Sequence, residues 1–491
     1  MNYRYQTYGL FINGEFVESI DGDYSDIYNP ATGDVLAKAT NGSKLDIEKA
    51  VEAAFYAKEK WKISAVVERS RILMEVAKII RGNLDYLAYV EALDSGKPII
   101  ETVEDVKAIA DQFDYFAGAI RVETDECIRQ DQNNMTMIIK EPYGVVAQII
   151  PWNFPFLLAG WKIAPALAAG NCIVIKPSQQ TPLSLLELAR LTKDIIPKGV
   201  LNVLTGAGSI VGKIMIQNKK IDKISFTGST DVGRIIGEAA AKMIVPISLE
   251  LGGKSANVIF PDAPMEKAIE GAARAILYGQ GQVCNAGSRL FVHESIYDEV
   301  LSKLEKIFRS VKIGNPIDPT TRMGSLINKE QMNKVLNYVD IGLAEGARLI
   351  CGGKQIVKPP FDKGYFMEPT IFANVANSMK IAQEEIFGPI LVVIPFGTEA
   401  EVIKMANDSE YGLAGACWTM DINRALRVAN AVETGLFWIN EYHLTPVGTP
   451  FGGIKSSGYG RENHKDAIEE YSRLKTIYIS TNTDASGYYG S

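Results

Sequence analysis

The feature that most limits the fold of this chain is a regular alternation of short apolar segments and longer helical segments between Val145 and Glu250. Such alternation is typical of a parallel, doubly wound β-sheet with helices on both faces. We therefore predict an α/β unit in this part of the chain. Its strands are expected near 145–150, 172–176, 201–204, 223–226 and 246–250, and its helices near 156–170, 182–195, 208–218 and 230–243.

Open α/β sheets bind ligands at the carboxyl ends of their strands. Small, polar or charged residues follow each of the expected strands, so this edge of the sheet is the expected binding site. The residues are Pro151, Lys176, Thr205-Gly206, Phe226-Thr227-Gly228 and Glu250-Leu251.

A second α/β unit is expected after the glycine pair Gly252-Gly253, because 491 residues are too many for one ordinary core. Its strands are predicted at 256–260, 289–293, 390–396 and 413–418. The predicted division is 1–122 with 143–251 for the first unit, 252–468 for the second, and 123–142 with 469–491 for a small β arm and tail.

The chain before Val145 is expected to contain a hairpin and several helices. Asn13-Gly14 is the preferred tight-turn pair between Leu10–Ile12 and Glu15–Val17. Ser43 and Asp46 have the spacing of a helix cap, and helical stretches follow at 65–95 and 101–120. Residues 123–142 are polar and predict either a projecting hairpin or an ordinary surface loop, and 476–480 alternate like an edge strand.

Composition excludes several classes of protein. The net charge of −7 argues against nucleic acid or an anionic membrane as the main partner. The chain starts without a signal-peptide pattern and has no apolar run of about 20 residues. Five widely spaced cysteines predict neither a disulfide framework nor a zinc site, and we expect no metal and a cytoplasmic location.

One cysteine lies in unusual surroundings. Cys284 is flanked by small residues in the segment Gln280–Arg289, which would let a ligand approach its sulfur, although a buried inert cysteine gives the same pattern. Two other segments change that balance, namely Pro151-Trp152-Asn153-Phe154-Pro155 and Leu249-Glu250-Leu251-Gly252-Gly253-Lys254.

Together these three segments resemble the aldehyde dehydrogenase superfamily. The resemblance extends through three further motifs in the family's order and covers roughly residues 8 to 480. The further motifs are Phe226-Thr227-Gly228-Ser229, Glu385-Ile386-Phe387-Gly388-Pro389 and Pro450-Phe451-Gly452-Gly453. The resemblance implies an NAD(P)-binding first unit, a catalytic second unit, an oligomerisation arm, and a homodimer or homotetramer that acts on a small-molecule aldehyde.

The resemblance also implies three catalytic roles. Cys284 would be the nucleophile, and a cysteine–histidine dyad is not expected because none of the three histidines lies in a family motif. Glu250 would be the general base that activates water, the other reading being a structural acceptor at the end of a strand. Asn153 would supply an oxyanion donor together with the Cys284 N–H, whereas an isolated asparagine here would be a turn residue.

A nicotinamide cofactor, NAD or NADP, is expected along the same sheet edge, with its pyrophosphate at a helix N-terminus. The glycine run Gly206–Gly212 is one residue too long for the usual dinucleotide fingerprint, and we read it as a tight turn. By resemblance, the cofactor-binding residues are Ile149, Trp152, Lys176, Ser178, Gln179, Gly208, Phe226, Thr227, Gly228, Ser229, Leu251, Gly252, Glu385 and Phe387.

Gln179 departs from the glutamate that the family commonly has at this place. Because a glutamine does not repel a 2′-phosphate, we expect NADP to be tolerated beside NAD. Phe154, Trp161 and Phe451, with Trp438, are expected to line an aldehyde tunnel or else to pack in the core. The motifs contain no arginine for a substrate carboxylate, which favours a neutral aldehyde.

The predicted activity is oxidation of an aldehyde to the carboxylic acid through a cysteine thioester. An enzyme that acylates coenzyme A is the nearest alternative, but such members typically lack the base that Glu250 supplies. A cofactor-independent cysteine esterase would leave the parallel sheet unexplained. An inactive nucleotide-binding scaffold would be expected to lack Cys284 or Glu250, and both are present.

Overall fold

The predicted parallel sheet is present in the computed structural model, which describes residues 3–490. Eight strands lie in the order β22-β12-β11-β8-β9-β10-β2-β3, and the five central strands are parallel. The strands are β2 (Leu10–Ile12), β3 (Glu15–Val17), β8 (Val145–Ile149), β9 (Cys172–Lys176), β10 (Leu201–Val203), β11 (Lys223–Thr227), β12 (Ile247–Glu250) and β22 (Gly458–Tyr459).

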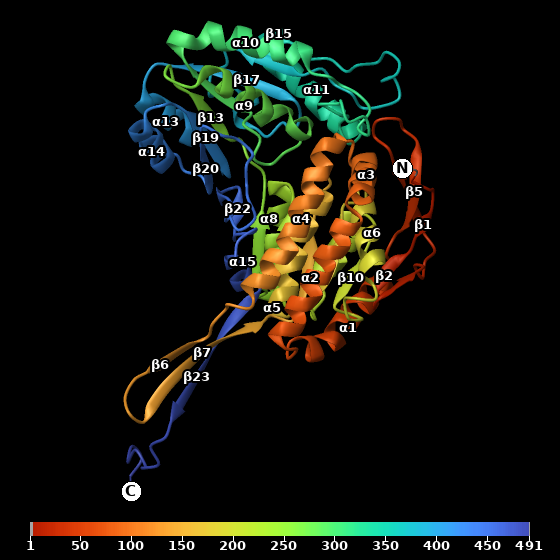
Figure 1. Cartoon of the computed structure of the whole chain (residues 1–491), viewed down its shortest axis with the longest axis vertical. Helices are drawn as coiled ribbons and strands as arrows, with labels where there is room; N and C mark the ends of the chain where they lie inside the picture. Colours follow the sequence, from red (N-terminus) through yellow and green to blue (C-terminus); the bar gives the residue numbers. More distant parts are fainter. Residues whose placement is uncertain (1–2, 491) are drawn as a thin grey trace.

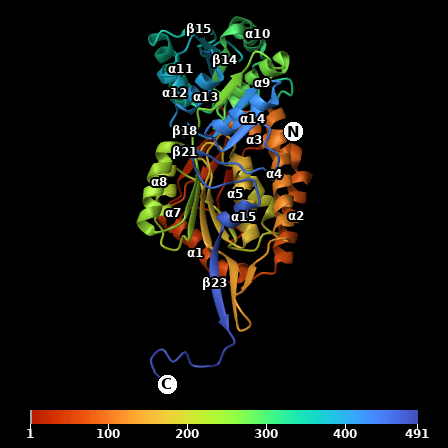
Figure 2. The same ribbon diagram turned by 90° about the vertical axis from the view of Figure 1, so that its left-hand side faces the viewer.

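Helices cover both faces of this sheet. Figure 2 shows α7 and α8 on one side of the strands and α2, α4 and α5 on the other. The helices are α1 (Lys44–Trp61), α2 (Val66–Gly82), α3 (Leu84–Ser95), α4 (Ile99–Ala119), α5 (Pro155–Ala169), α6 (Leu183–Thr192), α7 (Lys213–Ile216) and α8 (Thr230–Met243). The doubly wound α/β prediction is therefore confirmed.

Two details of the helix prediction were wrong. The stretch 65–95 is interrupted at Asn83 (φ −122°), which ends α2 and precedes α3. The stretch 208–218 is not one α-helix, because Gly208–Gly212 forms a π-helical turn before the short α7. The predicted cap of α1 is confirmed, since Ser43 and Asp46 form a reciprocal capping box.

Helix α5 is the central helix of the first unit and leads directly from the Pro151–Pro155 motif. Pro155 occupies its first turn, and Gly170 ends it in the left-handed conformation (φ 96°). Every residue of α5 except Leu157 is buried, and the buried set includes Lys162. A helix that is apolar all round belongs in a core, and this burial fixes the residues just before it.

The second sheet has seven strands in the order β15-β16-β17-β14-β13-β19-β20, parallel except for the β15–β16 pair. The four predicted strands are present, and β15, β16 and β20 were missed. The strands are β13 (Ala256–Ile259), β14 (Arg289–His293), β15 (Arg348–Cys351), β16 (Thr370–Ala373), β17 (Ile390–Phe396), β19 (Ala414–Trp418) and β20 (Leu436–Ile439). The helices are α9 (Met265–Leu277), α10 (Tyr297–Ser310), α11 (Lys329–Ala344), α12 (Lys380–Gln383), α13 (Glu399–Asn407) and α14 (Ile422–Ala431). The later helix α15 (Asp466–Glu470) instead contacts α5 of the first unit and β23.

The polar segment 123–142 forms a projecting hairpin rather than a loop. Strands β6 (Glu126–Arg129) and β7 (Asn134–Pro142) pair with the late strand β23 (Ser472–Ser480) in the order β23-β7-β6. Figure 1 shows this three-stranded arm extending away from the body, with the C-terminus beyond its tip. The prediction of a late edge strand is therefore confirmed.

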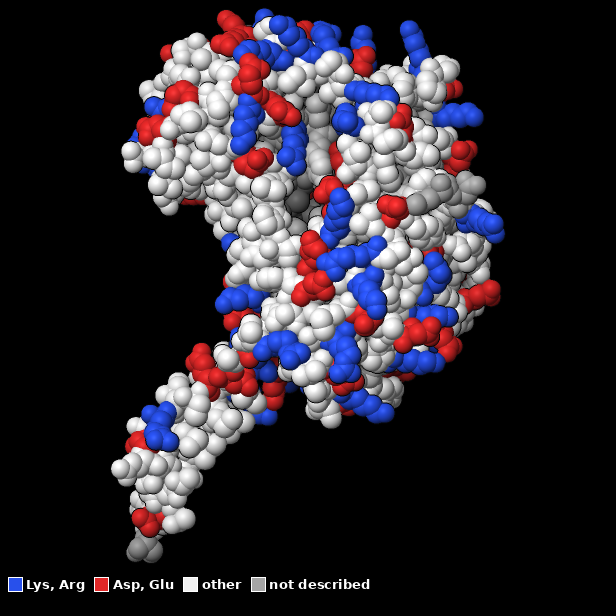
Figure 3. Space-filling model, in the orientation of Figure 1, with Lys and Arg blue, Asp and Glu red and all other residues white. Residues whose placement is uncertain are grey.

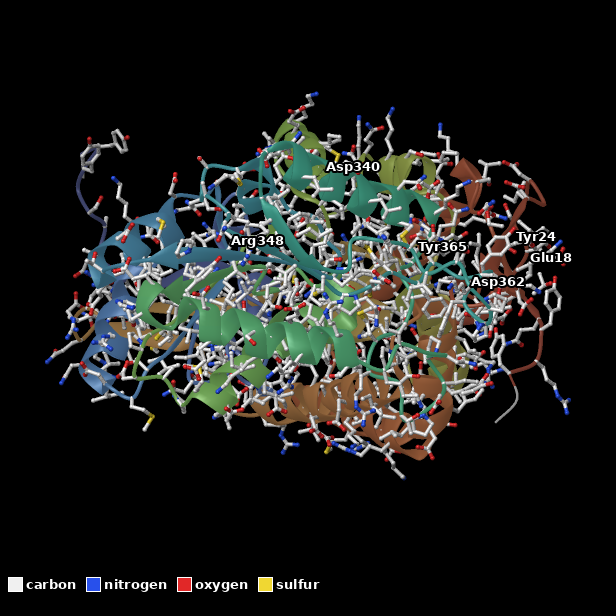
Figure 4. All side chains as sticks on the ribbon, turned by 90° about the horizontal axis from the view of Figure 1, so that it is seen from above. Glu18, Tyr24, Asp340, Arg348, Asp362 and Tyr365 are labelled. Carbon is white, nitrogen blue, oxygen red and sulfur yellow. The ribbon has the colours of Figure 1, made fainter. Side chains whose placement is uncertain are left out.

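Small strands and a long loop complete the body. The strands β1 (Thr7–Tyr8), β4 (Tyr24–Tyr28) and β5 (Val35–Thr40) form a separate three-stranded sheet, and β18 (Tyr411–Gly412) pairs with β21 (Ile454–Lys455). In Figure 4, Asp362 and Tyr365 lie on the same side as Glu18 and Tyr24. The Tyr365 N–H donates to the Pro30 carbonyl at 3.1 Å, so a loop of the second unit contacts the N-terminal segment.

Candidate active site

Cys284 lies in a loop that is packed tightly by glycines. The loop follows a turn in which Gly279, Gln280 and Gly281 all have positive φ (56°, 58° and 71°). A Cβ on Gly281 would lie 2.2 Å from the Gly388 carbonyl oxygen, and one on Gly253 would lie 2.3 Å from the Cys284 carbonyl oxygen. The small residues noted in the sequence therefore let three motifs meet at this cysteine.

The thiol of Cys284 is partly accessible in this chain. Burial raises its pKa, and the nearby carboxylates of Glu250 and Glu385 raise the pKa further. The sequence places Glu250 and Glu385 far from Cys284, but the fold brings both carboxyls within electrostatic range of the sulfur. Since thiolate is the reactive form, removal of this proton needs a base or a nearby positive charge.

Asn153 lies against the same loop. Its Nδ2 donates to the Gln282 carbonyl at 2.8 Å, and the residue is buried. An amide nitrogen carries two hydrogens, so this contact fixes the amide and leaves the second N–H for another acceptor. The arrangement suits a donor for an oxygen bound near Cys284.

Glu250 ends β12, between β11 and β22. Its side chain is buried, and its Oε1 has no hydrogen-bond partner within residues 3–490. Burial raises the pKa of this carboxyl well above its usual value, and the carboxyl of Glu462 adds to the rise. A carboxyl without a structural partner and with a raised pKa has the properties of a general base.

A cavity of about 660 Å³ leads to Cys284 between the two units. Figure 3 shows the surface hollowed between the two lobes on the face that carries α4 and α9. All three expected tunnel residues line this cavity, and the rings of Trp161 and Phe451 lie 5.0 Å apart. The residues that line this cavity together with Cys284 include Phe154, Trp161, Tyr278, Val283, His443 and Phe451.

Trp438 does not belong to this tunnel, which corrects the sequence-based expectation. It is absent from the described residues that line the cavity, and its Nε1 donates to the Leu444 carbonyl at 2.7 Å. Its ring packs on Tyr442. Trp438 therefore packs behind the residues that line the tunnel.

A second cavity of about 700 Å³ opens at the carboxyl ends of the first sheet, between α7 and α8. Ile149, Gly208 and Phe226, three of the residues predicted to bind the cofactor, line this cavity. Ser229 caps α8 by accepting from the Val232 N–H, and the N-terminus of α8 lies at this edge of the sheet. Thr227 carries a buried Oγ1 without a partner among the described residues.

The other predicted cofactor residues lie around this edge. Gly212 of the cavity wall would place a Cβ 3.7 Å from Lys176, so Lys176 borders the cavity. Burial lowers the pKa of Lys176 to about 8, and its Nζ donates to the Pro177 carbonyl. Ser178 accepts from the Gln180 N–H, and Gln179 donates to the Ser25 hydroxyl at 2.5 Å.

Five of the predicted cofactor residues connect this edge to Cys284. Glu385 accepts from the Gly253 N–H at 3.0 Å, and a Cβ on Gly252 would lie 2.6 Å from the Glu385 carboxylate. The rings of Trp152 and Phe387 meet edge to face at 5.3 Å. Leu251 packs against Gly233 at the start of α8, and a Cβ on Gly233 would lie 2.5 Å from the Leu251 side chain.

A dinucleotide fits this arrangement. An apolar slot suits a base, a helix N-terminus suits a pyrophosphate, and an unpaired buried hydroxyl at Thr227 can take a polar contact. The residues Trp152, Phe387, Gly252 and Glu385 then lie between this cavity and Cys284. Among residues 3–490, no group of three or more His, Cys, Asp or Glu side chains could hold a metal ion.

Comparison with known proteins agrees with this geometry. The sequence model of the aldehyde dehydrogenase family matches residues 16–477. An aldehyde dehydrogenase of Rhodospirillum rubrum is 43% identical over 490 residues, 98% of this chain and 96% of that protein. The NAD⁺ complex of an aldehyde dehydrogenase from Bacillus cereus is 43% identical, with a TM-score of 0.95 and 97% of each chain covered. Betaine aldehyde dehydrogenase from Staphylococcus aureus, also in complex with NAD⁺, is 41% identical, with a TM-score of 0.97 over 99% of this chain and 97% of that one.

The chain belongs to the aldehyde dehydrogenase family. It is an oxidoreductase that acts on an aldehyde, as the sequence predicted. In the part of this aldehyde dehydrogenase that the structure describes, no helix is long and apolar enough to cross a membrane.

Two groups of buried charges near the site of this aldehyde dehydrogenase were missed from the sequence. Lys162 of α5 is ion-paired with Glu462 and lies 3.1 Å from the Ser225 hydroxyl, behind Glu250. Lys97 is ion-paired with Asp105 beside the tunnel. A lysine inside the apolar run 154–170 was the one available signal for the first group. Lys97 and Asp105 lie in or beside ordinary helical stretches, so the sequence gave no signal for this second pair.

Proposed function

We propose that this aldehyde dehydrogenase oxidises a small aldehyde to the carboxylic acid with NAD, through covalent intermediates on Cys284. The observation that carries the proposal is the convergence on Cys284 of an amide donor and an unpartnered buried carboxyl, at the inner end of an aromatic cavity. The NAD⁺ complexes of the two similar enzymes support NAD as the cofactor.

The first half of the reaction forms a thioester. The Cys284 sulfur attacks the aldehyde carbonyl, and the oxygen that becomes negative accepts from the Asn153 amide and the Cys284 N–H. The cofactor supplies the acceptor for the hydride that leaves this carbon. Removing one such oxyanion donor typically costs about 10²–10³ in rate.

The second half releases the acid. Glu250 takes a proton from water as that water attacks the thioester carbon, and the carbon–sulfur bond breaks to return the thiol. The balance is aldehyde, NAD⁺ and water to carboxylic acid, NADH and a proton. Because burial raises the pKa of the Cys284 thiol, its proton has to leave before the attack, and the positive ring of a bound nicotinamide would favour that loss.

The remaining assignments belong to this proposal. Residues 1–122 with 143–251 bind the cofactor, 252–468 carry the nucleophile, and 123–142 with 469–491 join subunits of a homodimer or homotetramer. The five cysteines of the described chain are free thiols, which supports a reducing cytoplasm. Use of NADP beside NAD stays a prediction that rests on Gln179.

The decisive experiment replaces the nucleophile. Cys284→Ala should reduce NAD-dependent oxidation of an aldehyde panel below detection while NAD binding, measured by calorimetry, stays within about twofold of the parent. Cys417→Ala is the matched control, because Cys417 is buried in the second sheet and its loss should leave activity in place. Steady turnover by Cys284→Ala contradicts the proposal.

The same assay separates the two alternative activities. A coenzyme A-acylating enzyme would form NADH faster when coenzyme A is added and would not need Glu250. A cysteine esterase would hydrolyse esters at the same rate after cofactor binding is lost. The unpartnered Glu250 carboxyl and the cavity at the sheet edge favour the hydrolytic dehydrogenase.

A further inference from the structure

A buried ion pair borders the tunnel without touching Cys284. Lys97 follows α3, Asp105 lies on α4, and their side chains are only 2% and 5% exposed. Asp105 lines the tunnel cavity, one helical turn from Glu101, which lines it too. The reaction proposed above uses neither Lys97 nor Asp105.

The cation of this pair lies on an aromatic ring of the tunnel. The Lys97 Nζ is 3.6 Å from the centroid of the Phe154 ring and 6.0 Å from the centroid of the Tyr278 ring. Phe154 and Tyr278 are stacked, with centroids 6.2 Å apart and planes 22° apart. A desolvated ammonium over a ring face is attracted to it, so Lys97 restrains the position of the Phe154 ring.

The second carboxyl of α4 restrains the other ring through the backbone. The Oε2 of Glu101 accepts from the Gly279 N–H at 3.0 Å. Gly279 directly follows Tyr278 and has a positive φ of 56°. Helix α4 therefore holds both stacked rings, one through Asp105 and Lys97 and the other through Glu101.

Such a pair is not needed for stability alone. Taking two charges out of water costs about as much as their attraction returns, and apolar residues of similar size often serve as well. The structural consequence of this pair is local, because Phe154 is bonded to Asn153 and its ring lines the cavity that ends at Cys284.

We propose that Lys97 and Asp105 are positioning residues that fix the Phe154 ring in the tunnel wall and thereby set the enzyme's preference among aldehydes by size. This inference rests on the proposed function. A bulky aldehyde contacts the Phe154 ring, which the pair already holds in place. Without the pair, ordering this ring costs part of the binding free energy of the bulky aldehyde. A short aldehyde does not reach the ring to the same extent.

The test removes both charges of the pair together, so that neither Lys97 nor Asp105 is left without its partner. Lys97→Met with Asp105→Asn should lower the ratio of kcat/KM for phenylacetaldehyde to that for acetaldehyde by roughly fivefold to thirtyfold, the range that a desolvated cation–π contact can supply. The change should lie in a raised KM for phenylacetaldehyde, with kcat for acetaldehyde and NAD binding within about twofold of the parent. Lys97→Arg keeps the cation and should keep the parent's ratio.

The chain offers a matched control away from the tunnel. The Lys58 Nζ lies 4.3 Å from the centroid of the Phe55 ring and 3.2 Å from the Asp222 carboxylate. Among the described residues that line the tunnel cavity, Lys58 and Asp222 are both absent. Lys58→Met with Asp222→Asn therefore removes the same kinds of contact and should leave the ratio unchanged.

A double-mutant cycle connects the pair to the ring. Phe154→Leu should itself lower the ratio, and adding the pair substitutions to it should have no further effect. Additive effects contradict the inference, and so does an unchanged ratio in the pair variant. If Phe154→Leu keeps the parent's ratio of kcat/KM for the two aldehydes, the inference is overturned even when the pair variant does not fold. A parent that reduces no NAD with any aldehyde overturns the proposed function as well, so the two failures are distinguishable.

Discussion

Two carboxyls near one sulfur show how the surroundings of a residue decide its role. Glu250 and Glu385 both lie close enough to Cys284 to raise the pKa of its thiol. Glu385 accepts from the Gly253 N–H, which occupies the carboxylate in a structural contact. The Oε1 of Glu250 has no such partner in the described chain. The sequence alone left both readings open for Glu250, and this difference favours the base.

Glu250→Gln should separate the two halves of the reaction. Glutamine keeps the shape of the side chain but cannot take a proton, so thioester hydrolysis should slow by about 10²-fold or more. The expected result is a burst of NADH equal to the enzyme concentration, followed by a slow steady state in stopped-flow absorbance. Because burial raises the pKa of Glu250, the parent's steady rate should also rise with pH as this carboxyl loses its proton.

Glu385→Gln is the comparison for that experiment. Its carbonyl oxygen can still accept from Gly253, so hydrolysis should not become the slow step. If the burst disappears in Glu250→Gln and no acyl-enzyme is found by mass spectrometry, Glu250 has another role.

Helix α4 carries a buried carboxyl that couples protonation to stability. Burial raises the pKa of Glu101 to about 8 from 4.5. Between these values the native chain holds a proton that the unfolded chain has released. The contribution of this proton to the free energy of unfolding is fully present below pH 4.5 and is lost as the pH rises through about 8. In this range the free energy of unfolding falls by up to about 1.4 kcal/mol per pH unit.

We therefore expect Glu101→Gln to flatten the fall in unfolding free energy between pH 5 and pH 8. Glutamine keeps an acceptor for the Gly279 N–H and cannot ionise. Denaturant titrations across this range measure the slope, which should decrease by the equivalent of one proton. Glu104→Gln, at an exposed position of the same helix, should leave the slope as it is, and equal slopes in the parent and Glu101→Gln would refute the assignment.

The sequence predicted elements well where the evidence for them is local. The five central strands and α5, α6 and α8 were predicted to within a few residues, because apolar segments and turn residues mark their ends. The four-residue strands β15, β16 and β20 were missed, since segments so short have little periodicity. The equally short β10, β12 and β13 were predicted because turn residues or motifs adjoin them in the sequence. The break at Asn83 was missed because both sides of it are helical.

The candidate site divides in the same way. Cys284, Asn153 and Glu250 lie in motifs that the sequence displays, so they could be proposed from the sequence. Lys162 and Glu462 lie 300 positions apart in the chain, and only the packing of α5 against the late C-terminal segment brings them together. Side-chain contacts of this kind have no signature in a single sequence.

The assembly of the whole molecule is expected to depend on the arm. Strand β23 pairs with β7 along its entire length, from Ser472 with Pro142 to Ser480 with Asn134. Deleting residues 476–491 removes half of this ladder and exposes the backbone groups of β7. We expect the subunit dissociation constant to rise by on the order of tenfold or more, measured by sedimentation velocity.

Deleting only residues 482–491 is the control, because it leaves β23 intact. This shorter truncation should sediment like the parent. A monomeric parent, or an unchanged oligomer after the longer deletion, would show that the arm does not join subunits.

The position of β22 has a consequence for how the chain is made in the cell. This strand closes the edge of the first sheet by pairing Gly458 with Glu250 and Tyr459 with Leu249. A ribosome releases the chain from its N-terminus, so β12 and its carboxyl emerge long before their last partner does. The first sheet therefore has an open edge while the roughly 200 residues between β12 and β22 are synthesised, and the Glu250 carboxyl becomes buried only when synthesis is nearly finished. Until then the nascent chain holds the Cys284 thiol without a buried general base beside it.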